Sequence, residues 1–229
     1  MYSLTTLVIS QHSVNHDMKT SFVLSSAQAI QMAILANEST LESLDRAIGD
    51  GDHYINMKRG SQAIVEMQNE LATLSADAAL QKIGLKLLST IGGASGPLLA
   101  SFCMSMAKSL KENGDDHVLK VATAFAAGVD AIRQRGKADI GEKTMLDVLI
   151  PVANTFQSLA TQNADPAKIC STLLLTAEQG MQATKDLIAT KGRAAGLGER
   201  AIGHIDPGAK SCQLMIEAVC NLVLENHSN

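Results

Sequence analysis

Apolar residues recur along this chain three or four positions apart, which is the spacing of α-helices. The clearest case is residues 211–225, where the apolar positions are Cys212, Met215, Ile216, Val219, Cys220 and Val223. Residues 118–134 repeat the pattern with Val121, Ala122, Phe125, Val129 and Ile132. Side chains at this period share one face of a helix and pack against a neighbouring helix. Both segments are therefore predicted to be amphipathic helices.

Further helical tracts are predicted over most of the chain, and short loops separate them. They cover residues 21–36, 40–46, 55–72, 77–89, 97–112, 144–161 and 166–187. Pro151 lies inside one of these apolar runs, where its missing N–H is expected to bend the helix or shift its start. The sequence lacks the alternation typical of strands, and short loops favour antiparallel neighbours. We therefore predict an all-α fold, a single domain of about eight helices in an antiparallel bundle.

The composition agrees with an all-α fold and argues against nucleic-acid binding. The chain has 229 residues, enough for one domain with a sizeable core, and is 46% apolar but only 3% aromatic. This composition favours helices over sheets. The formal net charge of −4 gives no positive field for nucleic acid, and the aromatic residues that stack on single strands are scarce. We therefore predict no nucleic-acid partner.

Nothing in the sequence predicts export or membrane insertion. The first 21 residues have no basic region before their short apolar run, so a signal peptide is not predicted. Apolar stretches stay below the roughly 18 residues that span a membrane. The four cysteines form no CxxC pair, which favours a reducing, cytoplasmic location. Residues 1–17 are predicted to be a flexible N-terminal extension of a domain at residues 18–229.

Three aspartates lie within eight residues and are the first candidate for chemistry. Asp45, Asp50 and Asp52 surround Gly49 and Gly51 in the segment LDRAIGDGDHYINMKRG, residues 44–60. Carboxylates so close repel one another unless a cation or several donors hold them. Glycines let the backbone turn tightly enough to bring them together. Because oxygen ligands in this number suit Mg²⁺ with bound phosphate, the loop predicts a metal–phosphate site.

The sequence of this loop has other interpretations. A capped turn between helices would also contain Asp and Gly. An EF-hand is excluded, because its fifth, sixth and twelfth positions would be Tyr54, Ile55 and Ser61. His53 follows the aspartates, and either a general base or a hydrogen-bonded structural histidine fits the sequence there.

Two further loops have phosphate- or nucleotide-binding character. Residues 90–98 place three glycines, with Ala94 and Ser95 between them, before a strong helix, whose free N–H groups and dipole attract phosphate. The alternative is a turn of small residues that lets two helices approach closely. Residues 135–145 approach a P-loop, but Glu142 separates the second glycine from Lys143, and a helix leads in where a strand is required. Contact with a nucleotide base or sugar remains open for this loop.

A fourth loop, residues 191–208, is cationic and rich in glycine. It contains five glycines among eighteen residues, together with Lys191, Arg193, Arg200 and His204. Arginine near a metal–carboxylate loop would neutralise phosphate oxygens during transfer. Short loops of a bundle gather at its ends, where they build sites on a rigid scaffold. We therefore predict that the four loops form one shared site.

Taken together, four segments resemble the nucleotide-binding L subunit of dihydroxyacetone kinase. They are LDRAIGDGDHYINMKRG (44–60), IGGASGPL (91–98), RGKADIGEKTMLDVLIPV (135–152) and KGRAAGLGERAIGHIDPGAKS (191–211). The similarity covers roughly residues 20–225. In that family eight antiparallel helices form a barrel, and a nucleotide is held at one end through two Mg²⁺ ions. The resemblance implies the same fold here, with ADP or ATP and two Mg²⁺ as cofactors.

The resemblance also assigns roles to single residues. The implied Mg²⁺ ligands are Asp45, Asp50 and Asp52. The implied phosphate neighbours are His53, Asn56, Ala94 and Ser95. Gly136 and Met145 would line the adenine and ribose side. The residues implied to close over the nucleotide are Arg193, Asp206, Pro207 and Gly208. The three aspartates with Arg193 form the implied catalytic set. Two positions depart from the family: Tyr54 replaces a glycine and Gly196 replaces an aromatic residue, so the choice of partner or substrate is open.

The family implies partner subunits. A K subunit binds dihydroxyacetone, and an M subunit carries the phosphohistidine that converts bound ADP to ATP; the L subunit then passes the phosphoryl group to the ketone. We therefore predict a phosphotransferase-system subunit, and a homodimer is left open. Two alternatives remain: a subunit of an ATP-dependent kinase for dihydroxyacetone or another short ketose, and a non-catalytic regulatory protein that senses nucleotide.

Overall fold

The computed structural model describes residues 4–114 and 117–227, and these form helices and loops without a strand. The α-helices are α1 (Leu4–Ala36), α2 (Glu38–Ile48), α3 (His53–Val65), α4 (Gln68–Leu71), α5 (Ala76–Thr90), α6 (Ser95–Asn113), α7 (Val118–Gly136), α8 (Leu146–Thr161), α9 (Pro166–Ala183) and α10 (Pro207–His227). Two 3-10 helices, η1 (Thr184–Asp186) and η2 (Arg193–Ala201), follow α9. The all-α prediction is confirmed.

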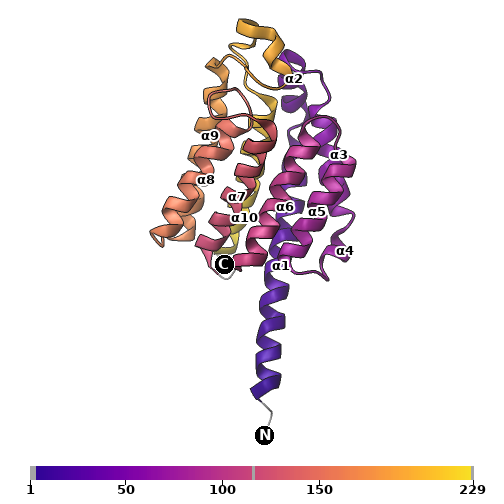
Figure 1. Ribbon diagram of the computed structural model, residues 1–229, viewed down its shortest axis with the longest axis vertical. Helices are drawn as coiled ribbons and strands as arrows, with labels where there is room; N and C mark the ends of the chain where they lie inside the picture. Colours follow the sequence, from indigo (N-terminus) through magenta and orange to yellow (C-terminus); the bar gives the residue numbers. More distant parts are fainter. Residues whose placement is uncertain (1–3, 115–116, 228–229) are drawn as a thin grey trace.

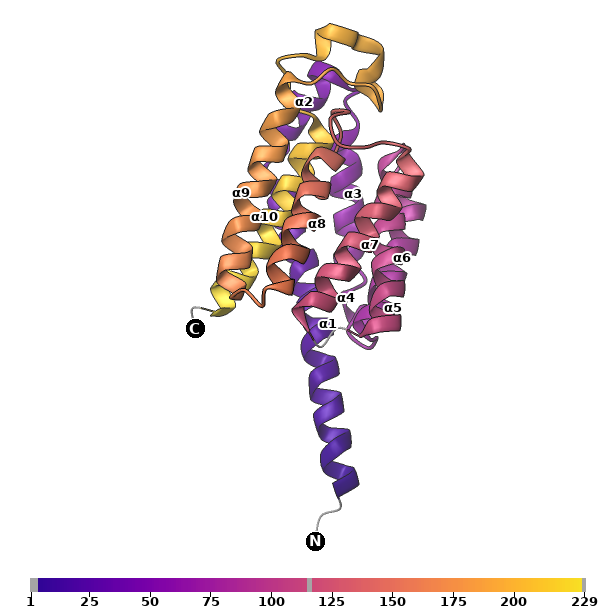
Figure 2. The same ribbon diagram turned by 60° about the vertical axis from the view of Figure 1, so that its left-hand side comes forward.

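The eight longer helices pack as a closed ring. Each helix contacts the next one in the order α1, α3, α5, α6, α7, α8, α9, α10, and α10 contacts α1 and so closes the ring. Neighbours run in opposite directions, because each connection within the described chain turns back at one end of the bundle (Figures 1 and 2). The short helices α2 and α4 lie in the connections from α1 to α3 and from α3 to α5. The predicted antiparallel arrangement is thus present.

Local sequence explains where several helices begin and end. Pro166 opens α9 where its missing N–H is tolerated, and the Asp165 carboxylate accepts a hydrogen bond of 2.9 Å from the Ala167 N–H. Helix α7 ends at Gly136, and the next residue, Lys137, leaves the helical path with a φ of 47°. Pro151 lies inside α8, which begins at Leu146, two residues after the predicted start. Pro151 cannot donate to the Asp147 carbonyl four residues earlier.

The main hydrophobic core lies between α7, α8, α9 and α10. Val129, Leu146, Val152 and Leu173 are buried in it, and a second cluster around Leu41 joins α1, α2, α3 and α10. Cys212 and Cys220 are buried free thiols, in agreement with their predicted place in a packed stripe. The core holds the helices rigidly, so the loops at the ends are fixed relative to one another.

Helix α1 is longer than the predicted tract at residues 21–36. Its first turns project beyond the bundle, at the end opposite α2 (Figure 1). The predicted flexible extension at residues 1–17 overlaps these turns, and its mobility stays a prediction. Among the described helices, none is both long and apolar enough to cross a membrane.

Candidate functional site

The four loops singled out in the sequence lie at one end of the barrel. They connect α2 to α3, α5 to α6, α7 to α8, and α9 to α10. Alternating helix directions place these connections together, and Figures 1 and 2 show them at the top, beside α2. The connections through α4 and between α8 and α9 lie at the other end. The scaffold therefore brings the predicted loops to one face.

The three aspartates converge. Each of Asp45, Asp50 and Asp52 offers an oxygen, and these oxygens lie within 4.8 Å of one another. Asp45 comes from the last turn of α2 and is buried, while the other two are exposed. A Cβ at Gly49 would overlap the Asp45 carboxylate, and Gly51 has a φ of 81°, so both glycines are needed for this loop conformation. The loop forms an all-oxygen cluster that suits Mg²⁺.

His53 connects the aspartate loop to the start of α10. Its N–H donates to Asp45 Oδ2 at 2.9 Å, and its ring Nε2 lies 2.9 Å from Ser211 Oγ. The Ser211 hydroxyl donates in turn to the Gly208 carbonyl at 3.1 Å. Burial lowers the pKa of the His53 imidazole, although the carboxylates of Asp45 and Asp52 oppose the shift. The ring thus links two loops.

Arg193 reaches the aspartate cluster from the fourth loop. Its Nε lies 2.8 Å from Asp50 Oδ2, and the two side chains are 67% and 39% exposed. An ion pair exposed to this degree contributes only about 0–1 kcal/mol to stability. The arginine is consequently close to the cluster but weakly held by Asp50.

The second loop faces the first through Asn56. This buried residue of α3 has its amide oxygen 3.4 Å from the place where a Cβ at Gly92 would lie. Helix α6 begins at Ser95, after Ala94, and no side chain caps its first N–H groups. A Cβ at Gly96 would overlap the Ile91 carbonyl, so this turn requires glycine for close packing. Uncapped N–H groups at a helix start are of the kind that attract anions such as phosphate.

The third and fourth loops meet at Met145 and Gly208. A Cβ at Gly208 would lie 3.7 Å from Met145 Cβ and 3.0 Å from the Asp206 carboxylate. Asp206, Pro207 and Gly208 form the turn that opens α10, and Asp206 Oδ2 accepts from the Ala209 N–H at 2.7 Å. Gly136 ends α7 against Leu98 of α6. Met145 is thus adjacent to the Asp206–Gly208 turn, whereas Gly136 packs against α6.

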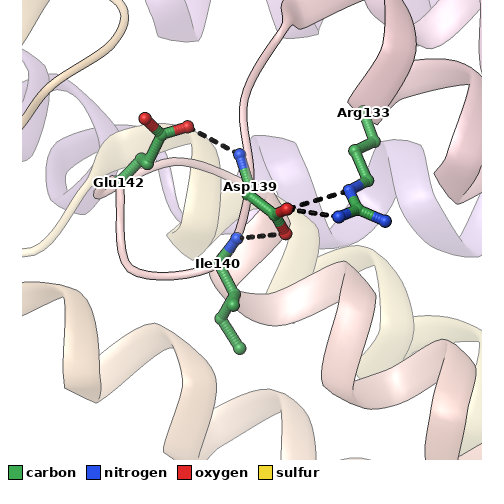
Figure 3. A network of polar contacts seen from close by, with 4 residues as sticks. All are labelled: Arg133, Asp139, Ile140 and Glu142. Carbon is green, nitrogen blue, oxygen red and sulfur yellow. Dashed lines mark hydrogen bonds and ion pairs between the residues drawn. The ribbon is translucent and has the colours of Figure 1, made fainter.

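Residues that the sequence reasoning did not select hold the third loop in place. Figure 3 shows Arg133 paired with Asp139, whose N–H donates to Glu142 Oε2 at 2.6 Å. The Thr190 hydroxyl donates to Glu142 Oε1 at 2.8 Å, which ties the fourth loop to this network. Hydrogen bonds from Thr190 and the Asp139 N–H lower the pKa of Glu142. In the sequence, Glu142 only rules out a P-loop, and its place directly after Gly141 in a glycine-containing loop is the one local signal of this role.

A shallow cavity of about 570 Å³ lies beside this network. Its lining residues are Asp130, Arg133, Gln134, Lys137, Ala138, Asp139 and Glu142. None of the clustered aspartates lines it, so this cavity is separate from the candidate metal site.

The two departures from the family pattern lie in different surroundings. The Tyr54 ring is 3% exposed and packs with Ile34, Leu41 and Leu214 between helices. Gly196 has no atom within 4 Å of where its Cβ would be. Tyr54 therefore acts through helix packing, while position 196 leaves open space in the fourth loop.

The sequence matches the DAK2 domain over residues 47–221. It is 42% identical over 188 residues to the "PEP-dependent dihydroxyacetone kinase 2, ADP-binding subunit DhaL" of Listeria innocua, covering 81% of this chain and 85% of that protein. The corresponding DhaL subunit of Escherichia coli is 39% identical over 185 residues, covering 80% of this chain and 88% of the relative.

More distant relatives are larger proteins. Rat triokinase/FMN cyclase is 32% identical over 195 residues, which are 85% of this chain but 33% of that protein. Among solved structures, the dihydroxyacetone kinase of C. freundii in complex with AMP-PNP and Mg²⁺ matches with a TM-score of 0.69. The match has 22% identity and covers 88% of this chain and 34% of that chain, and it supports the fold alone.

Proposed function

The chain belongs to the DAK2 domain family, and from this premise we propose that it is the ADP-binding subunit of a PEP-dependent dihydroxyacetone kinase. The observation that carries the proposal is the cluster of Asp45, Asp50 and Asp52 at the loop end of the barrel. The chain bearing this cluster matches separate ADP-binding subunits over most of their length. An enzyme subunit with nucleotide at this end accounts for both findings.

The residues of the cluster fit Mg²⁺. The carboxylate oxygens lie within 4.8 Å of one another, and two of the three side chains are exposed. An ion bound there would keep coordination positions for water and phosphate. When bound, Mg²⁺ would neutralise phosphate charge and hold the phosphates in place. Asp45, Asp50 and Asp52 would supply the ligands, and two ions are proposed. Asp45 is oriented by the His53 N–H, so its oxygen is held for coordination before metal arrives.

The remaining loops would hold the nucleotide. We assign His53, Asn56, Ala94 and Ser95 to the phosphates, because the free N–H groups of α6 face the Asn56 side of the aspartate loop. Met145 and Gly136 are assigned to the base and ribose, next to the turn of Asp206, Pro207 and Gly208. Arg193 would move from Asp50 to phosphate oxygens as charge develops in transfer.

Two transfers make up the proposed reaction. ADP held by this chain accepts a phosphoryl group from the phosphohistidine of an M subunit, and the histidine nitrogen–phosphorus bond breaks as the bond to ADP forms. The γ-phosphoryl of the ATP so formed would then pass to a hydroxyl of dihydroxyacetone on a K subunit. The bond between the γ-phosphorus and the bridging oxygen breaks as the bond to the hydroxyl oxygen forms, the hydroxyl proton goes to solvent, and ADP remains on this chain. The contribution of this chain is positioning and charge neutralisation. A cytoplasmic location and the homodimer stay predictions.

The chief alternative is a subunit of an ATP-dependent kinase for dihydroxyacetone or another short ketose. Rat triokinase/FMN cyclase also contains a matching region, but its identity of 32% is below the 42% and 39% of the separate subunits. Retention of the three aspartates argues against a purely regulatory nucleotide sensor. The higher identity favours the PEP-dependent kinase.

Native mass spectrometry of the chain purified without added nucleotide tests the proposal. We expect a mass increment of one ADP with two Mg²⁺, because ADP in the proposed cycle stays bound. Asp50→Asn should lose this increment, whereas Asp130→Asn, the same change on the exposed face of α7, should keep it. A chain that binds MgATP only on addition and exchanges it rapidly would favour the ATP-dependent kinase. Binding of neither nucleotide would reject both enzymes.

A further inference from the structure

Lys143 is the largest fully buried side chain among the described residues, with 1% of its surface exposed. A buried ammonium is costly unless it is hydrogen-bonded and its charge is compensated. Its Nζ donates to the carbonyl oxygens of Thr184 and His204, the latter at 2.6 Å. The carboxylates of Asp206, Asp186 and Asp147 favour its charged form, against the burial that lowers the pKa of Lys143. A charge so fully enclosed has a role beyond solubility.

The backbone at Lys143 gives a second reason to look for such a role. Its φ is 60°, in the left-handed region where glycine is favoured and a lysine costs about 1 kcal/mol or more. Glycine occupies other positive-φ positions of these loops, such as Gly141. The backbone conformation would favour glycine at position 143. The hydrogen bonds made by the side chain explain why a lysine is present there.

Those bonds join three segments. Thr184 follows α9 and His204 lies near the end of the fourth loop, so Lys143 holds together two positions that are twenty residues apart. The Thr184 hydroxyl accepts from the Asp206 N–H at 3.0 Å, which places Thr184 between Lys143 and the turn that opens α10. Lys143 itself lies two residues before Met145, in the third loop.

Asp147 fixes the other side of the same loop. Its two carboxylate oxygens accept from the N–H groups of Gly141 and Thr144, the second at 2.7 Å. Helix α8 is therefore rigidly connected to residues 141–144, and Lys143 connects those residues to Thr184 and His204. Across this connection, a Cβ placed on Gly208 would lie 3.7 Å from Met145 Cβ.

We propose that Lys143 is a positioning residue that sets Met145 against the Asp206–Gly208 turn and so forms the base side of the nucleotide site. This inference rests on the proposed function. Two of the three N–H donors of the Lys143 ammonium bond the two carbonyls, and the side chain is buried, so the proposal gives it no contact with phosphate. It acts through the backbone of two loops. Replacement of Lys143 should therefore weaken nucleotide binding and leave metal binding by the aspartates unchanged.

The test compares Lys143→Met with Lys137→Met. Lys137 lies in the same loop, also has a positive φ, and is exposed, so the control makes the same chemical change without removing buried bonds. The probes are Mn²⁺ alone, followed by electron paramagnetic resonance, and ADP in the presence of Mg²⁺, followed by calorimetry. Lys143→Met should weaken ADP binding about ten- to hundred-fold, the size typical of energetic coupling between a binding site and a separate position. Mn²⁺ binding should stay at the wild-type value, and Lys137→Met should change neither.

Lys143→Gly covers the case in which the methionine variant fails to fold. Glycine suits the positive φ, and its small size leaves room for water to bond the two carbonyls. The same selective loss of ADP binding is expected. Wild-type affinity for ADP in a folded variant, or an equal loss of Mn²⁺ and ADP binding, would overturn the positioning role. A wild-type chain that binds Mn²⁺ but no ADP would reject the proposed function, and this inference with it.

Discussion

The carboxyl group of Asp206 has its pKa raised to about 7, chiefly because burial disfavours the charged form. The ordinary pKa of an aspartate side chain is 3.8, so between about pH 4 and pH 7 the folded chain binds more protons here than the unfolded chain. Stability contributed by this group is therefore present at low pH and is lost as pH rises through that window. Asp206 also ends the contact path through Thr184 to Lys143.

Asp206→Asn should remove this pH dependence, because asparagine cannot ionise but can still accept from the Ala209 N–H. We expect the melting temperature of the wild type to fall relative to the variant as pH rises from 5 to 8. Thermal melts of both proteins at each pH measure the difference. A difference that stays constant across this range would show that Asp206 does not titrate there.

At the same scale, the sequence predicted the acidic residues of the site better than the residues that support them. Asp45, Asp50 and Asp52 are close in the chain, so their convergence needs only one glycine-containing turn. The hydrogen-bond partners of Lys143 lie forty-one and sixty-one positions away in the sequence, so the local sequence pattern does not predict them. Nucleotide contacts of Gly136 and Met145 stay predictions.

At the scale of the helices, α9 packs directly against the backbone of α8 at Gly180. A Cβ at Gly180 would overlap the Asp147 carbonyl and come within 3.0 Å of Val148 Cα. Both are backbone atoms, and they cannot rotate away as a side chain can. Pro151 leaves this carbonyl without its helical donor, and Gly180 permits α9 to pack against it.

Gly180→Ala should therefore destabilise the chain by about 1–3 kcal/mol, the usual cost of overpacking. Gly196→Ala is the matched control, since its new methyl group would meet no atom within 4 Å. Urea unfolding of the two variants and the wild type measures the change. Equal stability of the two variants would mean that the α8–α9 contact can open without cost.

Helix existence was predictable from periodicity, but some boundaries were not. The predicted tract at residues 55–72 is divided into α3 and α4, because α3 ends at Val65 and Met67, with a ψ of 3°, departs from the helical path before α4 begins. The 3-10 helix η2 falls inside a predicted loop. Its short turns are amphipathic over Ala194 and Ala201, and they pack on Ile48, a partner that local sequence does not reveal.

On the scale of the whole molecule, the closed ring of eight helices separates two ends with different composition. Four glycine-rich loops occupy one end, and ligand there would restrain segments from all four. We expect MgADP to slow hydrogen exchange at residues 49–53, 91–95, 140–145 and 203–208. Residues 66–75 and 162–165, at the opposite end, should exchange at the same rate as before.

Hydrogen–deuterium exchange with peptide resolution checks this expectation. Global stabilisation of about 2.7 kcal/mol is expected when MgADP is present at a hundred times its dissociation constant, and it should be seen as a higher melting temperature. Protection confined to the opposite end, or spread evenly along the helices without a change at the loops, would place the ligand elsewhere.

The outer turns of α1 and the last turn of α10 lie at the end of the barrel away from the candidate site (Figure 1). This gives the experimenter a practical orientation. Affinity tags, fluorophores or a surface tether joined near either of these helix ends would leave the loop face open to solution. An immobilised chain would then present its nucleotide end outward, so capture of partner subunits from solution can be measured without the attachment blocking them.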